Sequence, residues 1–245
     1  KGLIQAVDYS FTDAGSTGTD TIDFPMPPEG CPPAHRVTES CCNTAVSGPA
    51  LVGNTCCYGF CVGACCGRPL RIGGVSRVAS VRPSRAWLGD SCAELPDSRA
   101  ISAMTRDAIA HAWREDARME HASIASFNQF SLQLLAVGAP SDLVRDAQRA
   151  ALDEVGHAER CFAVAAAVSG RANGPCGLPL HDFRVEDDLA SAAASAAMEG
   201  CVGETLAALL AGARARRCER PEVRDTLTVI ASDEARHAEL GWRFV

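Results

Sequence analysis

The chain lacks several features that would place it in a familiar class. It has no cluster of Lys and Arg with interleaved aromatic residues, and its formal net charge is -7. A nucleic-acid surface needs concentrated positive charge, so we do not expect a nucleic-acid partner. No apolar run approaches the ~20 residues that span a bilayer, and no membrane span is expected. No charged segment followed by an apolar one opens the sequence, although a removed signal stays open. With 245 residues, 47% of them hydrophobic, the chain can bury one large core or two smaller ones.

The sequence also lacks any C-x-x-C pair, although it has thirteen cysteines. Nine of them lie between Cys31 and Cys92, among Gly and Pro and with few large apolar residues. Such a segment needs covalent cross-links to hold a shape, so we predict disulfides and an extracytoplasmic location: secreted, periplasmic or on the cell surface. A bound metal or iron-sulfur cluster is the alternative, but those sites commonly use C-x-x-C. Four cysteines lie beyond this segment: Cys161, Cys176, Cys201 and Cys218.

The first part of the chain reads as two pieces. Residues 1–30 are rich in Thr, Gly, Asp and Pro without helical periodicity, which predicts an extended N-terminal arm. Residues 31–95 form the predicted cysteine-rich, disulfide-stapled β and loop module. Within it, Gly73-Gly74 lies between two short apolar segments, which is typical of a tight β-hairpin.

From residue 98 to 245 the apolar residues follow helical periodicity, and the fold class is therefore mainly α. Gly and Pro breakers predict four long helices: from Asp97 or Ser98 to about residue 137, from Ser141 as N-cap to about 168, from about 186 to 217, and from Pro221 to the end. The short turns predict two antiparallel hairpins. Residues 170–185 are long enough to run along the bundle as a crossover between them. No helix terminator precedes residue 245, so a continuation of the last helix stays open.

The heptapeptide D-E-x-x-H-A-E occurs twice, beginning at Asp153 and at Asp233. Residues three apart on a helix lie about 60° apart and one turn along, so the Glu and the His of each copy can bind one metal ion. Two copies predict two metal-binding helices.

A dinuclear carboxylate site in a four-helix bundle takes an E-x-x-H pair from each of two helices and one Glu from each of the others. The two pairs here are Glu154 with His157 and Glu234 with His237. On the third predicted helix, Glu204 is as far from the hairpin loop as Glu234, about thirteen residues, and is the expected ligand. Its face carries small residues that leave room for ions and substrate, namely Ala197, Gly200, Cys201 and Ala208.

Two further carboxylates, Glu199 and Glu120, are candidate metal ligands. Glu199 would lie about 140° round an α-helix from Glu204 and roughly 7 Å along it, so it is the poorer ligand. On the first predicted helix, an apolar stripe continues from Glu120, which makes Glu120 the inward-facing candidate. Its height differs from that of Glu154 by one turn, within the uncertainty of predicted helix ends. The alternative is that these carboxylates are simply solvated and the histidines are ordinary core residues.

The six residues resemble the metal positions of the ferritin-like di-iron carboxylate superfamily, which includes ferritins, rubrerythrins, acyl desaturases and bacterial multicomponent monooxygenases. Residues 233–237 look like the signature of that superfamily's last helix. The resemblance covers residues 98–245 and implies a ferritin-like four-helix bundle. Residues 119–127 and 138–140 are also similar to a set of bacterial ferritin-like proteins with a cysteine-rich front.

The Asp that begins each heptapeptide is expected to hold a metal-binding histidine, because such rings usually donate their second N–H to a carboxylate. The resemblance implies that Asp153 serves the histidine of the opposite helix, and Asp233 likewise. Arg236 is expected to pair with one of these acids. The alternative for both aspartates is a solvated surface position.

Two imidazoles and four carboxylates favour two iron ions, with manganese or a mixed pair as alternatives. Such a pair would activate dioxygen or peroxide, with electrons from an unknown donor. Both tyrosines, Tyr9 and Tyr58, precede the helices, which argues against a stored tyrosyl radical of the ribonucleotide-reductase kind. We therefore expect an extracytoplasmic di-iron oxidase or oxygenase. The alternatives are an iron-binding or iron-handling protein and a structural surface or filament protein whose metals brace the bundle. A homo-oligomer or surface assembly stays open.

Overall fold

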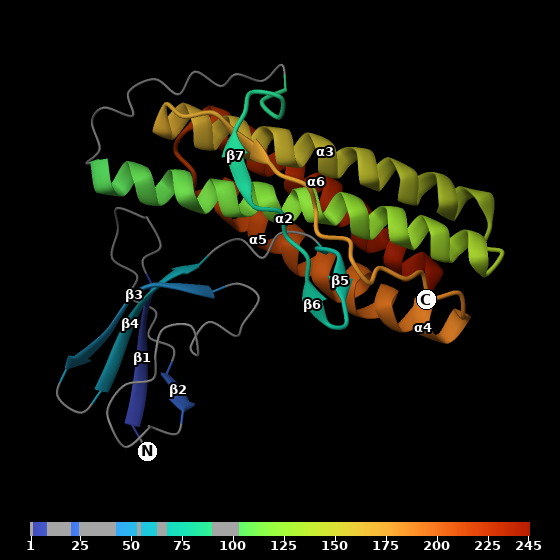
Figure 1. The fold of residues 1–245 in the computed structure, drawn as a ribbon, viewed down its shortest axis with the longest axis horizontal. Helices are drawn as coiled ribbons and strands as arrows, with labels where there is room; N and C mark the ends of the chain where they lie inside the picture. The colour runs from blue at the N-terminus through green and yellow to red at the C-terminus, as the bar shows by residue number, and fades with distance from the viewer. Residues whose placement is uncertain (1, 9–20, 25–42, 53–54, 63–67, 90–102) are drawn as a thin grey trace. The chain divides into compact units, whose positions relative to one another are not determined.

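The computed structural model describes residues 2–8, 21–24, 43–52, 55–62, 68–89 and 103–245, with the ranges up to 62 described by their backbone (Figure 1). The chain divides into two compact units, Lys1–Ala64 and Cys65–Val245, which are treated separately. The mainly helical fold class is confirmed, since helices dominate the second unit. The division at residue 64 differs from the expected ones at residues 30 and 95.

The first unit contains a four-stranded sheet. Its strands are β1 (Gly2–Asp8), β2 (Thr21–Phe24), β3 (Asn43–Val52) and β4 (Thr55–Val62), in the order β2-β1-β4-β3. β1 runs parallel to β4, and the other two pairings are antiparallel. Strands from the expected arm, 1–30, and from the expected cysteine-rich module, 31–95, therefore share one sheet. The disulfides predicted between residues 31 and 92 lie outside the side chains that the structure describes.

The second unit is a bundle of long helices. α2 (Ala103–Ala136) and α3 (Ser141–Ser169) form the first hairpin. α4 (Leu189–Ser195), the π-helix η2 (Ala196–Glu204) and α5 (Thr205–Arg217) follow one another without a break, and α6 (Pro221–Phe244) returns beside them. We refer to α4, η2 and α5 together as the third helix. Figure 1 shows the long crossover, in orange, running from the end of α3 along the bundle to α4.

The helix ends follow from local chemistry. Gly170 ends α3 in the left-handed region, at φ 70°, which glycine adopts without strain. Asp188 begins the third helix, because its side chain accepts a hydrogen bond from the Ser191 N–H at 2.8 Å, so that helix starts at Leu189 rather than near 186. Ser141 is the first residue of α3 instead of its N-cap, a position that Pro140 occupies.

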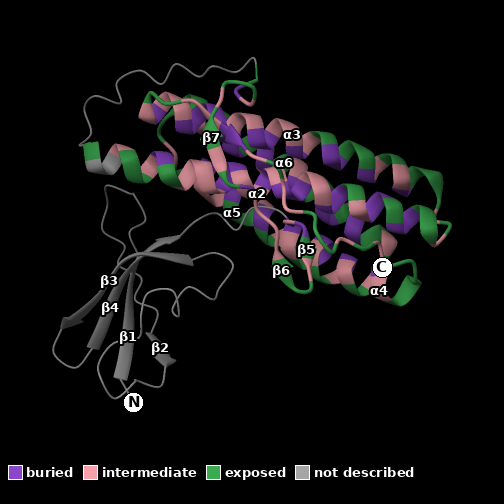
Figure 2. Cartoon of the chain, viewed as in Figure 1, coloured by how far each residue is buried: buried purple, intermediate pink, exposed green. Residues whose placement is uncertain are grey.

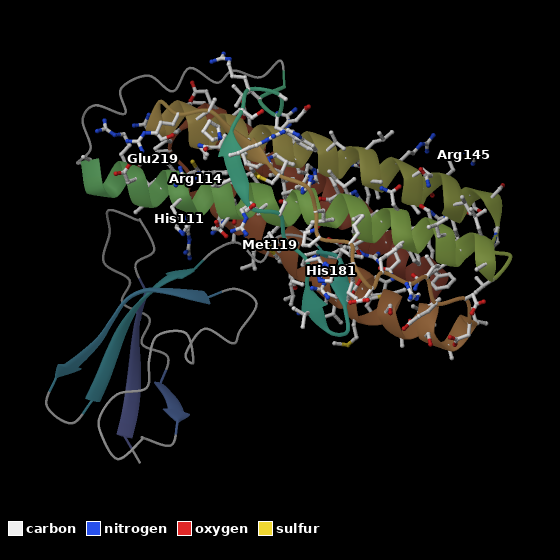
Figure 3. The ribbon with its side chains drawn as sticks, in the orientation of Figure 1. His111, Arg114, Met119, Arg145, His181 and Glu219 are labelled. Atoms are coloured by element: carbon white, nitrogen blue, oxygen red, sulfur yellow. The ribbon has the colours of Figure 1, made fainter. Side chains whose placement is uncertain are left out.

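Small β elements fasten the crossover to the segment that precedes α2. The predicted hairpin is confirmed: β5 (Arg71–Ile72) pairs with β6 (Val75–Ser76) across Gly73 and Gly74, both with positive φ. Beyond it, β7 (Val81–Pro83) pairs with β8 (Asn173–Pro175) of the crossover. His181, labelled in Figure 3, lies beside the hairpin, and its Nε2 is 3.4 Å from an Arg77 nitrogen.

Among the described residues, two apolar clusters lie on either side of the middle of the bundle, and a third, with Ala110, Val164 and Val168, lies farther along α2 and α3. The first includes Phe127, Phe130 and Leu240, and the second includes Phe162 and Ile230. On α2, α3 and α6 alike, the predicted metal ligands lie between the residues of the two clusters. Buried residues, purple in Figure 2, accordingly follow the inward faces of the helices. The middle of the bundle is therefore enclosed by apolar packing at both ends.

The third helix and α6 approach each other closely through two glycines. A Cβ atom on Gly241 would lie 2.9 Å from the carbonyl carbon of Gly200 and 3.0 Å from the backbone nitrogen of Cys201. Backbone atoms cannot give way as side-chain ends can. The missing side chains thus set the distance between η2 and α6, and the room predicted around Gly200 is filled by the α6 backbone.

Among the described residues, one stretch, Leu189–Arg217, is long and apolar enough to cross a membrane by length and composition. Core helices of soluble proteins pass the same test. This stretch packs against α6, and its buried face carries Glu204.

We expect Gly241→Ala to lower the free energy of unfolding by roughly 1–3 kcal/mol, since the added methyl group overpacks a backbone contact. Denaturant titration measures the loss. Gly156→Ala is the matched control, because a Cβ atom there meets nothing within 4 Å, and replacing a helical glycine should stabilise by about 0.5–1 kcal/mol. Equal stability of the two variants would contradict the close contact.

Candidate metal centre

The structure brings all six predicted ligands together in the middle of the bundle. Each is at most 2% exposed, and the four glutamates are fully buried. α2 contributes Glu120 and η2 contributes Glu204, while α3 and α6 each contribute one E-x-x-H pair. The one-turn difference predicted between Glu120 and Glu154 does not keep them apart. The six ligands are Glu120, Glu154, His157, Glu204, Glu234 and His237.

The six side chains form two overlapping groups, each able to hold a metal ion. One group adds Glu120 and His157 to the shared pair Glu154 and Glu234, and the other adds Glu204 and His237 to the same pair. Within each group the ligand atoms lie within 4.8 Å of one another. Glu154 and Glu234 belong to both groups, so their carboxylates would help to hold an ion in either group.

Most of the carboxylate oxygens at the centre have no hydrogen-bond partner in the protein. Both carboxylate oxygens of Glu120, Glu154 and Glu204 are buried without a hydrogen bond, as are one oxygen of Glu234 and Nδ1 of His157. Buried polar groups are normally paired, and unpaired ones are costly. These carboxylate oxygens and this imidazole nitrogen are atoms that bind metal ions, and bound ions would give all of them a partner.

Each histidine is held by an aspartate from the opposite helix. His157 Nε2 lies 3.0 Å from Asp233, and His237 Nε2 lies 3.3 Å from Asp153. An ionised carboxylate can only accept a hydrogen bond, so Nε2 of each neutral ring carries the proton and Nδ1 keeps its lone pair. Each Nδ1 lies 3.2–3.6 Å from oxygens of both Glu154 and Glu234, facing the centre.

One arginine connects the two aspartates. The guanidinium of Arg236 donates to Asp233 at 2.6 Å and to Asp153 at 3.0 Å. The sequence analysis predicted one such pairing, and the structure contains both. Arg236 therefore fixes the two carboxylates that orient the histidine rings.

The buried carboxylates shift one another's proton affinity. Burial, followed by the neighbouring charges of Glu154 and Glu234, raises the pKa of Glu120 well above its ordinary value. Burial and Glu234 raise the pKa of Glu204 in the same way. Burial also favours a higher pKa for Glu234, but the neighbouring rings of His157 and His237 outweigh it and hold that pKa below its ordinary value.

The pKa values of both histidines are raised, which favours the charged imidazolium form. Burial opposes the charge on His157, yet the hydrogen bond with Asp233 and the nearby carboxylates of Glu154 and Glu234 raise its pKa well above its ordinary value. Burial opposes the charge on His237 as well, and Asp153, Glu154 and Glu234 together raise its pKa well above its ordinary value. Without metal, bound protons therefore neutralise part of the negative charge that metal ions would otherwise neutralise.

The π-helix is the main feature that sequence reasoning missed. It covers Ala196–Glu204, so the helix that carries Glu204 is wound more widely where it passes the site. A π-helix bonds residue i to i+5, and such segments occur frequently at functional sites. The offset of 140° predicted between Glu199 and Glu204 assumed an α-helix and does not apply here. Gly200 and Gly203, two poor helix formers within this segment, were the available signal.

A buried polar network accompanies the π-helix. Arg68, only 3% exposed, donates to Ser126 of α2 at 3.2 Å and lies 3.7 Å from Glu199. Its guanidinium also lies over the rings of Phe127 and Phe130, at 4.7 and 4.9 Å. Phe127 in turn packs edge-on against His237. The segment before β5 therefore braces both η2 and one metal-ligand histidine.

A pocket of about 170 Å³ lies between α3 and α6, next to the centre. His237, Asp153 and Arg236 line it, together with Arg149 and Arg243 and the acids Asp146 and Glu239. Its charged groups balance, and Arg243 is paired with Asp142 and Asp146. The pocket gives small molecules access to the outer side of the His237–Asp153 pair.

Comparisons of the chain with protein-family models, with curated proteins and with solved structures found no match. The resemblance drawn from the heptapeptide repeat therefore stays a prediction. The buried Glu and His groups that could hold a metal ion are a property of this structure itself.

Replacing Asp233 by Asn should lower metal affinity about 10- to 100-fold, because the His157 ring loses the carboxylate that fixes its tautomer. Competition titration with a chromogenic chelator measures the affinity. Asp225→Asn, an exposed position on the same helix, should leave it unchanged. Equal affinities for the two variants would show that Asp233 does not act on the metal site.

Metal binding should release protons and strengthen as pH rises. The pKa values of Glu120, Glu204, His157 and His237 are all raised, so these groups hold protons that bound ions must displace. Higher pH leaves fewer protons to displace. Calorimetric titration near neutral pH, in buffers of different ionisation enthalpy, gives the number released. Affinity that is flat or falls with pH would contradict this protonation pattern.

Proposed function

We propose that the chain is an extracytoplasmic, ferritin-like protein that binds two iron ions in the bundle and uses them to activate dioxygen or peroxide. The observation that carries the proposal is the set of buried, partnerless ligand atoms contributed by four helices. The expected disulfides and the heptapeptide repeat support the location and the family respectively.

Charge balance supports two divalent ions. Four ionised carboxylates carry four negative charges, and two neutral histidines carry none, so two divalent cations neutralise the group. Buried charges are stable only when they are paired or coordinate metal. The aspartates are not part of this sum, because Arg236 and the two ring N–H groups already serve them.

The donor set supports iron ahead of softer metals. Carboxylate and imidazole ligands suit iron and manganese, and the centre contains no thiolate. When bound, two iron ions supply one-electron and dioxygen chemistry. The protein's own residues would hold the rings through Asp153 and Asp233 and keep water out through the apolar clusters on both sides.

The second candidate is iron handling, in which iron is bound or oxidised without an organic substrate. The size of the pocket beside His237 favours it, since about 170 Å³ is below the ~300–1,000 Å³ of pockets that bind drug-sized ligands. Dioxygen and peroxide need far less room. Both candidates share the metal site and differ in whether an organic molecule is consumed.

The test is anaerobic reconstitution of the full chain with ferrous iron, followed by metal analysis and oxygen consumption with a reductant. We expect two iron ions per chain and oxygen uptake that depends on them. Oxygen uptake that continues in step with oxidation of an organic reductant indicates turnover, whereas uptake that stops once all iron is ferric, with the organic reductant unconsumed, indicates iron handling. Fewer than one ion per chain would overturn both candidates.

Glu204→Ala separates the redox proposals from a purely structural role. It removes a ligand of one group only, so we expect about one ion per chain and the loss of oxygen uptake. Glu222→Ala, at an exposed position on α6, is the control and should keep both. If Glu204→Ala lowers only the melting temperature and leaves oxygen uptake intact, the metals merely brace the bundle.

A further inference from the structure

The outer face of the third helix is apolar and uncharged over most of its length. Between Leu189 and Leu210, every exposed residue is Leu, Ala, Met or Val. The face spans roughly 30 Å at 1.5 Å per residue. Contiguous exposed apolar surface of this kind is uncommon on monomeric proteins and marks interaction sites. We call it the outer face; its residues are Leu189, Ala190, Ala194, Met198, Val202, Leu206, Leu209 and Leu210.

The outer face is graded in size and in charge. Its first half carries the small Ala190 and Ala194, and its second half carries the large Leu206, Leu209 and Leu210. Acidic residues precede it at Glu186, Asp187 and Asp188, and the exposed Arg216 and Arg217 follow it. One end of the face therefore has small side chains beside acidic residues, and the other end has large side chains beside basic residues. When two such faces meet in opposite directions, small side chains lie against large ones and acidic residues lie near basic ones.

We propose that the outer face binds a second copy of this chain, with the two third helices antiparallel about a twofold axis at Val202. This register places Met198 opposite Leu206 and Ala194 opposite Leu210 of the second copy. It also places Asp187 opposite Arg217 and Asp188 opposite Arg216. A twofold axis makes each of these contacts occur twice, as in any isologous dimer.

Charge complementarity favours a second copy over a membrane. A helix that lies on a membrane surface combines its apolar face with Lys and Arg along the polar face. Here one end of the helix is acidic, and its inner face packs against α6 and carries the buried Glu204. The opposed charges at the two ends match the reversed helix of another copy.

The dimer would act on the metal centre through the π-helix. Met198 and Val202 lie on the outer side of η2, and Glu204 lies on its buried side. Packing by a second copy would brace the segment that positions this ligand. The inference does not depend on which metal is bound, and its test does not use metal content.

The first experiment measures mass in solution by sedimentation equilibrium of the full chain. We expect a dimer for the natural sequence. Val202→Glu places two carboxylates next to each other at the twofold axis, where the interface excludes water. Their repulsion should raise the dissociation constant of the dimer at least ~100-fold. Leu152→Glu is the matched control, because Leu152 is 71% exposed on α3, away from the outer face, and should stay dimeric. Circular dichroism melting checks that each variant is folded.

The second experiment tests the register by charge exchange. Asp187→Arg and Arg217→Glu each set like charges opposite one another in the proposed dimer, so each should weaken it roughly three- to tenfold. The double variant restores opposite charges and should dimerise like the natural chain. Rescue would not occur if these residues acted only on their own helix ends.

Three results would overturn the proposal. They are a monomeric natural chain, a dimer that Val202→Glu leaves intact while folded, and charge variants whose effects add instead of cancelling. Flotation of the natural chain with vesicles of phosphatidylcholine and phosphatidylserine, abolished by Val202→Glu, would replace the second copy with a membrane surface.

Discussion

The mutual repulsion of four buried carboxylates is the constraint on which the rest of this bundle depends. Two like charges about 4 Å apart repel by roughly 4 kcal/mol even at an effective dielectric constant of 20. Glu120, Glu154, Glu204 and Glu234 have no exposed surface to relieve that energy. The apolar clusters on both sides supply the packing that holds them together, and protons or cations must supply the opposing charge. A core designed for stability alone would place leucines here, whereas this arrangement is one that could hold metal ions.

Two further features keep the centre compact. Gly200 and Gly241 let the backbones of η2 and α6 nearly touch, which draws the third helix inward at the level of the glutamates. Within the π-helix, Glu199 lies beside Arg68 while Glu204 faces the centre. The histidines are held from the other side, by Asp153, Asp233 and the arginine between them.

The sequence predicted the parts that depend on periodicity and local chemistry. Helix ends at Gly170 and Pro221 and the hairpin at Gly73 follow from spacing that a single helix or turn enforces. Each E-x-x-H pair follows from helical spacing too, and the packing of the four helices brings the six residues together. The parts it did not predict depend on contacts between distant segments. Nothing near Arg68 indicates that its side chain enters the bundle, and the β7–β8 pairing joins residues about ninety positions apart. The π-helix escaped notice because α geometry was assumed for every periodic segment. The strands of residues 2–8 and 21–24 share a sheet with those of residues 43–52 and 55–62, and this pairing of distant segments is also one that local patterns do not indicate.

The single arginine between the two aspartates has a consequence for symmetry. The heptapeptides relate the two halves of the centre like copies of one unit, yet Arg236 in the second copy corresponds to Gly156 in the first. The π-helix likewise lies beside only one half. The two candidate ligand groups therefore differ in their protein surroundings although their ligands are the same in kind. Ions held by them would have different neighbours, because one group takes its extra glutamate from α2 and the other takes it from the π-helix.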